Sequence, residues 1–205
     1  MLRSLRLPSL LLFSLCFLVA CGPSRTTTRV DSEKQTDYSG RWNETDARKV
    51  ANKMIGGMLK SSWLQRWQKQ HDGNRPTVII GPIKNKTMQH IDEEIFIKDI
   101  ERNLVNSGKV RFVAAADERT ALRAEREDQQ TRATQETAAA MAQEIGADFM
   151  VYGTISSNVQ ETMEGDKASI FYTVNLELLN IESNVKAWLQ EKEIKKIVER
   201  SNVSM

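Results

Sequence analysis

Cysteine is scarce in this chain: among its 205 residues only Cys16 and Cys21 occur, and both lie near the N-terminus. The sequence from Gly22 onward therefore has no disulfide and no cysteine nucleophile. A fold without cross-links depends on its buried apolar surface. The folded part expected below has about 160 residues, a length at which a domain buries roughly 70% of the surface of its unfolded chain.

Motifs for catalysis are also absent, since no G-x-S-x-G, G-x-G-x-x-G, Walker or H-E-x-x-H pattern occurs. The two histidines are His71, in a polar run, and His90, which could share a helix face with Glu94 and bind a divalent metal. Asp92 and Glu93 also fit the first turn of a helix, where the helix dipole favours acidic residues. One histidine is a poor basis for a metal site. We expect no catalytic residue, no metal site and no cofactor.

Long hydrophobic runs are missing as well. The longest, residues 10–20, has eleven residues, whereas a membrane-spanning helix needs about 18 or more. It follows Arg3 and Arg6 and ends in Leu-Val-Ala-Cys, which is typical of a bacterial export signal. The alternatives are a plain secretory signal and a membrane span. The four residues resemble a lipobox, which implies cleavage before Cys21 and attachment of diacylglyceryl and N-acyl (palmitate-type) chains to that residue.

Charge of one sign is not in excess. The chain has 29 basic and 27 acidic residues, and the small surplus corresponds to Arg3 and Arg6 of the expected signal. A nearly neutral mature chain is unlike a nucleic-acid-binding protein, which has a basic face or stripe. It is also unlike a polybasic membrane-surface protein. We expect no nucleic-acid partner.

Three segments are expected along the chain. Residues 1–20 form the signal peptide. Residues 21–41 are almost free of apolar side chains after Pro23 and form a flexible tether, because such a segment cannot offset the entropy of ordering itself. Residues 42–205 form one globular domain.

Hydrophobic periodicity predicts an α+β fold, with helices packed on a mixed, mainly antiparallel sheet of four to five strands. The pattern of residues 169–180 has period two and returns after a turn at 181–184, which predicts a C-terminal β-hairpin. Gly56-Gly57 interrupts the first helical pattern, and Gly108 is expected to end the second helix. The expected elements are a helix from Asn43 or Thr45, strand 77–80 ended by Gly81-Pro82, helix 91–107 burying Ile95, strand 110–113, a helix capped by Asp117, helix 133–145, strand 148–157 and hairpin strands 169–180 and 185–196.

Tryptophan is the most informative aromatic residue here. Trp42 and Trp188 are expected to pack in the core, whereas Trp63 and Trp67 follow the glycine pair in a polar context, where packing and an exposed interaction patch are equally compatible with the sequence. The polar loop Lys84-Asn85-Lys86-Thr87 has no evident core role. We therefore predict that Trp63, Trp67 and the loop residues Lys84, Asn85, Lys86 and Thr87 contact a partner.

Five segments in order resemble one family: residues 39–43, 81–87, 106–113, 146–153 and 172–178. They are similar to the LpoB family, outer-membrane lipoproteins that activate a bifunctional, class A penicillin-binding protein. The resemblance covers residues 39–196. Gly22 after the lipid-bearing cysteine, where aspartate would favour the inner membrane, implies sorting to the periplasmic face of the outer membrane.

The resemblance implies a regulator rather than an enzyme, with no small-molecule substrate. Such a protein docks on a peptidoglycan synthase and stimulates cell-wall synthesis. The tether of about 20 residues is shorter than the long proline-rich tether of well-known members, so no partner-contact residue is transferred from the family. The alternative is a subunit of an outer-membrane export or envelope-assembly complex, like the curli-secretion lipoproteins.

Overall fold

The computed structural model describes residues 26–31, 34, 37, 39–114, 116–132 and 146–199. The chain divides into two compact units, Met1–Lys34 and Gln35–Met205. All helices and strands below belong to the second unit. The signal, Cys21 and the expected helix 133–145 lie outside the described residues. No described helix is both long enough and apolar enough to span a membrane.

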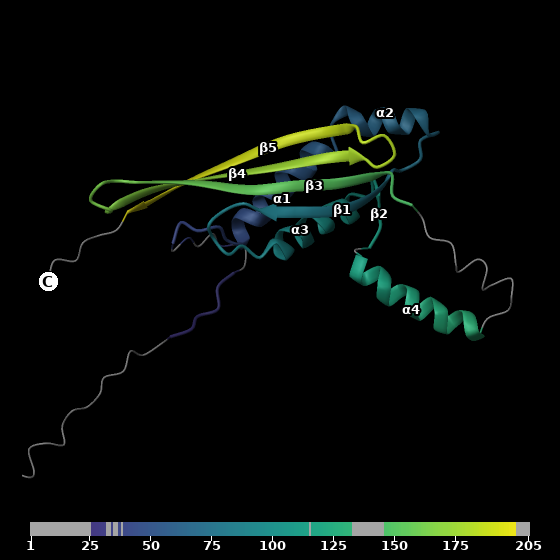
Figure 1. Ribbon diagram of the computed structural model, residues 1–205, viewed down its shortest axis with the longest axis horizontal. Coiled ribbons are helices and arrows are strands. Elements are labelled where there is room, and N and C mark those ends of the chain that lie inside the picture. The colour runs from purple at the N-terminus through teal and green to yellow at the C-terminus, as the bar shows by residue number, and fades with distance from the viewer. Residues whose placement is uncertain are drawn as a thin grey trace, which may run out of the picture. The chain divides into compact units, whose positions relative to one another are not determined.

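A five-stranded mixed sheet forms the centre of the second unit, with the strand order β2-β1-β3-β4-β5 (Figure 1). β1 is parallel to both β2 and β3, whereas β3, β4 and β5 form two long antiparallel pairs. The predicted α+β fold and mixed sheet are confirmed. The strands are β1 (Thr77–Asn85), β2 (Arg111–Phe112), β3 (Phe149–Glu161), β4 (Lys167–Asn180) and β5 (Lys186–Glu199).

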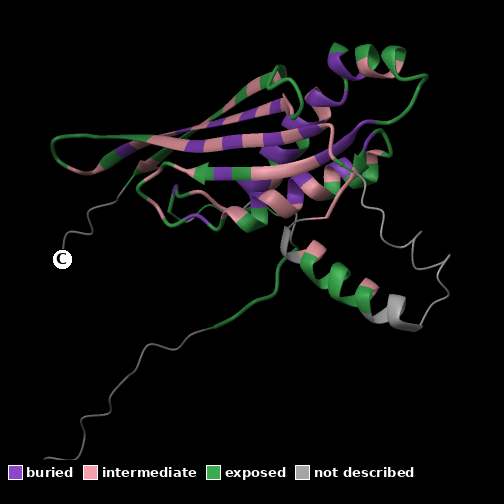
Figure 2. Ribbon diagram, turned by 45° about the vertical axis from the view of Figure 1, so that its right-hand side comes forward, coloured by how far each residue is buried: buried purple, intermediate pink, exposed green. Residues whose placement is uncertain are grey.

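The C-terminal hairpin has the predicted alternation. Every second residue of β4 from Ala168 to Leu178 is buried, and the residues between them are half-buried (Figure 2). Asn180 donates its backbone N–H to the oxygen of Val185, and Asn184 has a φ of +60°, which closes the turn. β3 is longer than expected and pairs with β4 from Phe149 opposite Asn180 to Glu161 opposite Ala168.

Two helices cover the buried face of the sheet. α1 (Glu44–Met58) begins at a capping box in which Asn43 and Asp46 exchange backbone and side-chain hydrogen bonds, and it continues through Gly56-Gly57. α3 (Glu93–Ser107) ends at Gly108, whose φ of +63° is the left-handed conformation expected at a helix end. The helices pack on each other, α1 beside β5 and α3 beside β1 and β2. In both views neither lies on the opposite sheet face (Figures 1 and 2).

Other boundaries differ from those predicted. Ile95 is exposed rather than buried, because the inward positions of α3 are Phe96, Ile100 and Leu104. Helix α2 (Ser62–Gln70) was not predicted, because its nine residues are mostly polar. Asp117 does not cap the next helix but lies within its first turn, since α4 spans Ala116–Arg132.

β1 does not end at Gly81-Pro82 as predicted. The strand continues to Asn85 because the register shifts between Ile80 and Ile83, which absorbs the interruption. A side chain at Gly81 would meet the Met150 sulfur at less than contact distance. The glycine and proline predicted a strand end from the sequence. In the sheet they lie within β1, where Gly81 packs closely against Met150 of β3.

Folded structure begins before the expected boundary at Trp42. Gly40 is buried, and its carbonyl accepts a hydrogen bond of 3.3 Å from the Tyr172 hydroxyl. Its φ is +66°, and a Cβ there would collide with the Val198 side chain, so this backbone approach needs glycine. Lys196 donates to the Arg41 carbonyl at 2.8 Å and forms ion pairs with Asp37 at 2.7 Å and Asp46 at 2.5 Å. These contacts fix Asp37 and residues 40–42 against β4, β5 and α1.

Candidate functional site

The polar loop predicted to contact a partner is internally hydrogen-bonded. Thr87 donates to the Asn85 side chain through its backbone N–H at 2.9 Å and its hydroxyl at 2.8 Å. Asn85 donates to the Gln89 carbonyl, and Gln89 donates its backbone N–H to the Thr87 hydroxyl. Lys84 and Asn85 belong to the end of β1 rather than to the loop itself. This geometry lowers the entropy cost of ordering the loop on binding.

The loop presents two cations and an apolar side chain to solvent. Lys84 and Lys86 are exposed, and the ammonium of Lys84 lies 5.9 Å from the centre of the Tyr152 ring. Met88 is fully exposed, which is unusual for a side chain of its size. Sequence reasoning missed Met88; its position as a single apolar residue in a polar loop is the signal that could have identified it.

Gln89 connects this loop to the N-terminal segment. Its side-chain oxygen accepts hydrogen bonds from the Tyr172 hydroxyl at 2.9 Å and from the Trp42 backbone N–H at 3.3 Å. Burial raises the pKa of Tyr172 above its ordinary value, so the phenol remains a protonated donor near neutral pH. The loop is thus held beside the point where the N-terminal segment enters the domain.

The tryptophans are divided between core and surface. Trp42 packs edge-on against Phe96 and Tyr172, and Trp188 is partly buried against the core, so the packing predicted for both is confirmed. Trp63 and Trp67 lie one turn apart on α2, with ring centres 5.0 and 5.1 Å from that of Phe149.

The prediction that Trp63 is exposed to contact a partner is wrong. Its side chain is 3% exposed, and its indole N–H donates to the Met58 carbonyl at 2.8 Å. The polar residues around it in the sequence occupy the outer face of α2. Trp67 is half-buried, and the ring of His71 stacks on it at a centre-to-centre distance of 3.6 Å.

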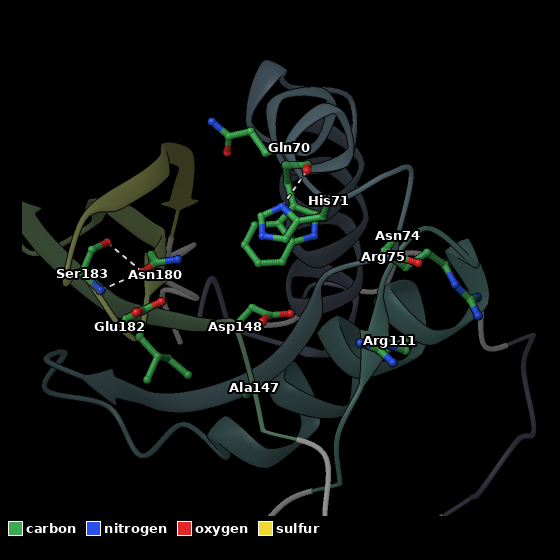
Figure 3. Close-up of a pocket in the computed structure, with 12 residues that line it drawn as sticks. Gln70, His71, Asn74, Arg75, Arg111, Ala147, Asp148, Asn180, Glu182 and Ser183 are labelled. Atoms are coloured by element: carbon green, nitrogen blue, oxygen red, sulfur yellow. Dashed lines mark hydrogen bonds between the residues drawn. The ribbon is translucent and has the colours of Figure 1, made fainter.

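Trp67 lines a polar pocket of about 770 Å³ near the starts of β1 and β3, which is drawn in Figure 3. Asp148 accepts a hydrogen bond from the Thr77 N–H at 2.7 Å, and Asn180 accepts two from Ser183, so these polar groups mainly hold the backbone. The wall also contains Gln70, His71, Asn74, Arg75, Arg111, Ala147, Ile181 and Glu182.

The structure does not bring all the predicted contact residues together. Thr77, which donates its N–H to the pocket residue Asp148, and Lys84 are seven strand residues apart, or about 23 Å. The surface around the loop, defined here as Lys84–Met88, and the pocket beside Trp67 are therefore separate features. We take the Lys84–Met88 surface as the stronger candidate because it is exposed and fixed.

A metal site at His90 gains no support from the geometry. His90 is exposed before α3, and Asp92 caps that helix by accepting from the Glu94 N–H at 3.1 Å. Among the described residues, no group of three or more potential metal ligands occurs. The Lys84–Met88 surface and the pocket beside Trp67 both carry hydrogen-bonding and charged side chains, which suit them to binding a partner.

A protein-family model described as peptidoglycan-synthase activator LpoB matches residues 46–194. This range runs from the first turn of α1 into β5. The chain therefore belongs to the LpoB family of peptidoglycan-synthase activators. This is a family of regulators rather than of catalysts, and its activity is directed at peptidoglycan synthases.

Solved structures give weaker likenesses. The C-terminal domain of LpoB from Escherichia coli has 17% identity and a TM-score of 0.45, over 74% of this chain and 99% of that one. The same domain from Salmonella enterica has 14% identity and a TM-score of 0.44 with equal coverage. Lipoprotein GNA1162 from Neisseria meningitidis has 10% identity and a TM-score of 0.38, over 62% of this chain and 88% of that one. No curated protein matches the sequence.

Proposed function

We propose that this protein is a non-enzymatic lipoprotein, anchored through Cys21 to the periplasmic face of the outer membrane, that binds and activates a class A penicillin-binding protein. The observation that carries the proposal is the family match, which covers the domain from α1 into β5. Activation requires only that the protein bind the active conformation of the synthase more tightly than the resting one. Catalytic groups of its own are not needed for that role.

We propose that the Lys84–Met88 surface makes the contact. Its hydrogen bonds fix the backbone before binding, and its two lysines favour an acidic patch on the synthase. Met88 offers a flexible apolar side chain that adapts to the surface of a partner. Trp67 provides a second contact at the pocket, and buried Trp63 supports it through their shared packing on Phe149.

Reversing the loop charges tests this contact. We expect the double variant Lys84→Glu/Lys86→Glu to weaken binding to a class A penicillin-binding protein by about tenfold or more, because like charges then face the acidic patch. The measurement is the dissociation constant, by surface plasmon resonance with the full chain in detergent. Binding by the unsubstituted chain should also weaken as salt rises.

A matched control is Lys53→Glu/Lys60→Glu, which reverses two exposed lysines at α1 and just beyond its end. This control should bind like the unsubstituted protein. Equal losses for both double variants would show a nonspecific effect of net charge and would contradict the proposed contact.

A further inference from the structure

β5 leaves a long edge of the sheet unpaired. It has fourteen residues and pairs only with β4, whereas the opposite edge strand, β2, has two. In both ribbon views β5 runs along the border of the sheet, with no described strand on its outer side (Figures 1 and 2). A long free edge is a template for another strand, and proteins commonly protect it with charged side chains.

The charged and apolar side chains of β5 alternate in a way that permits pairing with itself. In an antiparallel pair, opposing residues share a sheet face, so a two-fold axis must pass through a residue position. With that axis at Glu193, Glu191 lies opposite Lys195 of a second copy, and this pair occurs twice by symmetry. Neither side chain has an ion-pair or hydrogen-bond partner within the described residues.

The same register joins the exposed apolar residues of the edge. Leu189 is 58% exposed and Ile197 is 61% exposed, and each lies opposite the other residue of the second copy. Trp188 likewise lies opposite Val198 on the other face. The one like-charge pair is Glu193 with its own symmetry mate, at the axis. Lys192 lies opposite Ile194 on the helix-covered face, which is a neutral pairing of a charged with an apolar side chain.

The neighbouring registers are worse. An axis at Lys192 places Glu191 opposite Glu193 twice. An axis at Ile194 pairs Glu193 with Lys195, but it places Lys192 opposite Lys196 twice and leaves Leu189 facing Glu199. Like charges directly opposite each other destabilise strand pairs, whereas opposite charges and apolar pairs stabilise them. Of these three registers, the one centred on Glu193 has the fewest like-charge pairs and pairs the exposed apolar residues with each other.

We propose that two copies of this protein associate through β5, antiparallel and centred on Glu193, to form one continuous sheet. This inference goes beyond the proposed function, since it does not depend on the synthase. The helices of both copies then lie on one side of the joined sheet, and both open faces lie on the other. The occupant of the edge is a second copy because the complementary charge pattern is present within β5 itself.

Cysteine scanning of the full chain tests the register. At the axis, Glu193→Cys should give a disulfide-linked dimer on mild oxidation, because opposing Cα atoms lie about 4.5–5.5 Å apart. Glu191→Cys or Lys195→Cys alone should not, since each lies about 13 Å along the strand from its own symmetry mate. An equal mixture of those two variants should cross-link. The unsubstituted chain controls for Cys16 and Cys21.

Charge exchange tests the association in solution. By analytical ultracentrifugation in detergent, Lys195→Glu should raise the dimer dissociation constant at least tenfold, and Glu191→Lys/Lys195→Glu should restore it. Circular dichroism establishes that each variant is folded. A monomeric unsubstituted chain, or cross-linking that is equal at positions 191, 193 and 195, would overturn the proposal.

Discussion

Replacing Lys196 by alanine is expected to lower the free energy of unfolding by about 3 kcal/mol, because it leaves a buried carboxylate without its partner. The Lys196 side chain is 9% exposed and that of Asp46 is 8% exposed. The lysine also holds Asp37 and the Arg41 carbonyl. Urea unfolding followed by circular dichroism measures the loss, and residues 37–41 should become accessible to protease.

Lys98 is the matched control, because it too is ion-paired with two carboxylates, Glu101 and Glu118, each at 2.9 Å. Its side chain is 43% exposed, and exposed ion pairs contribute little to stability. Lys98→Ala should therefore leave the urea midpoint almost unchanged. Equal effects of the Lys196 and Lys98 substitutions would contradict the claim that burial makes the Lys196 cluster important.

The stabilisation by the ion pairs of Lys196 with Asp37 and Asp46 also depends on pH. Burial alone would lower the pKa of Lys196, but hydrogen bonds to Asp37 and Asp46 more than offset it, so the pKa is raised. Because the pKa of Lys196 is higher in the folded protein, its stabilising contribution is fully present below the pKa of lysine in the unfolded chain, about 10.4. The contribution is lost as pH rises through the pKa that Lys196 has in the folded protein. The stability difference between Lys196→Ala and the unsubstituted protein should accordingly shrink at strongly alkaline pH.

Cys21→Ala is expected to abolish lipid labelling and to release the protein from the membrane fraction. A thioether cannot form without the cysteine sulfur, and two or more acyl chains are what makes such anchoring stable. Labelling with a palmitate analogue, followed by membrane fractionation, measures both effects. Cys16→Ala is the control, because that residue lies within the expected signal and should not alter either result. Retained labelling of Cys21→Ala would contradict the proposed anchor.

The early start of the folded domain shortens the proposed tether. Between Cys21 and Asp37, the first residue fixed by Lys196, the chain can span at most about 55 Å when fully extended. The tether expected from the sequence, residues 21–41, would reach about 70 Å when fully extended. The point at which the folded domain begins therefore lies within this smaller distance of the membrane.

The sequence predicted those helices and strands whose ends and buried face are set by residues close together in the chain. Tyr172, Val174 and Leu176 alternate with polar residues, and that alone placed β4 and its face. Asn43 and Gly108 marked helix ends because a cap and a left-handed residue are local requirements. The α+β class followed from the order of such segments.

Features that depend on distant contacts could not be predicted in the same way. Polar neighbours made Trp63 look solvent-exposed, but α2 turns it toward Phe149. Gly81 predicts a strand end from the local sequence, and only its close contact with Met150 shows why a glycine lies within β1. The ion pairs of Lys196 join residues more than 140 positions apart, and no local pattern indicates them. The Lys84–Thr87 loop was located from sequence, whereas its connection to Tyr172 through Gln89 was not.

In the proposed function, this protein activates a peptidoglycan synthase by binding to it. The most direct measurement is the rate of glycan polymerisation by a purified class A penicillin-binding protein, with and without the full chain in detergent. We expect a rise of about fivefold or more, the scale of a coupling free energy of about 1 kcal/mol, and a clearly smaller rise with Lys84→Glu/Lys86→Glu. An unchanged rate at concentrations where the two proteins are shown to bind would mean that this protein is not an activator of that synthase.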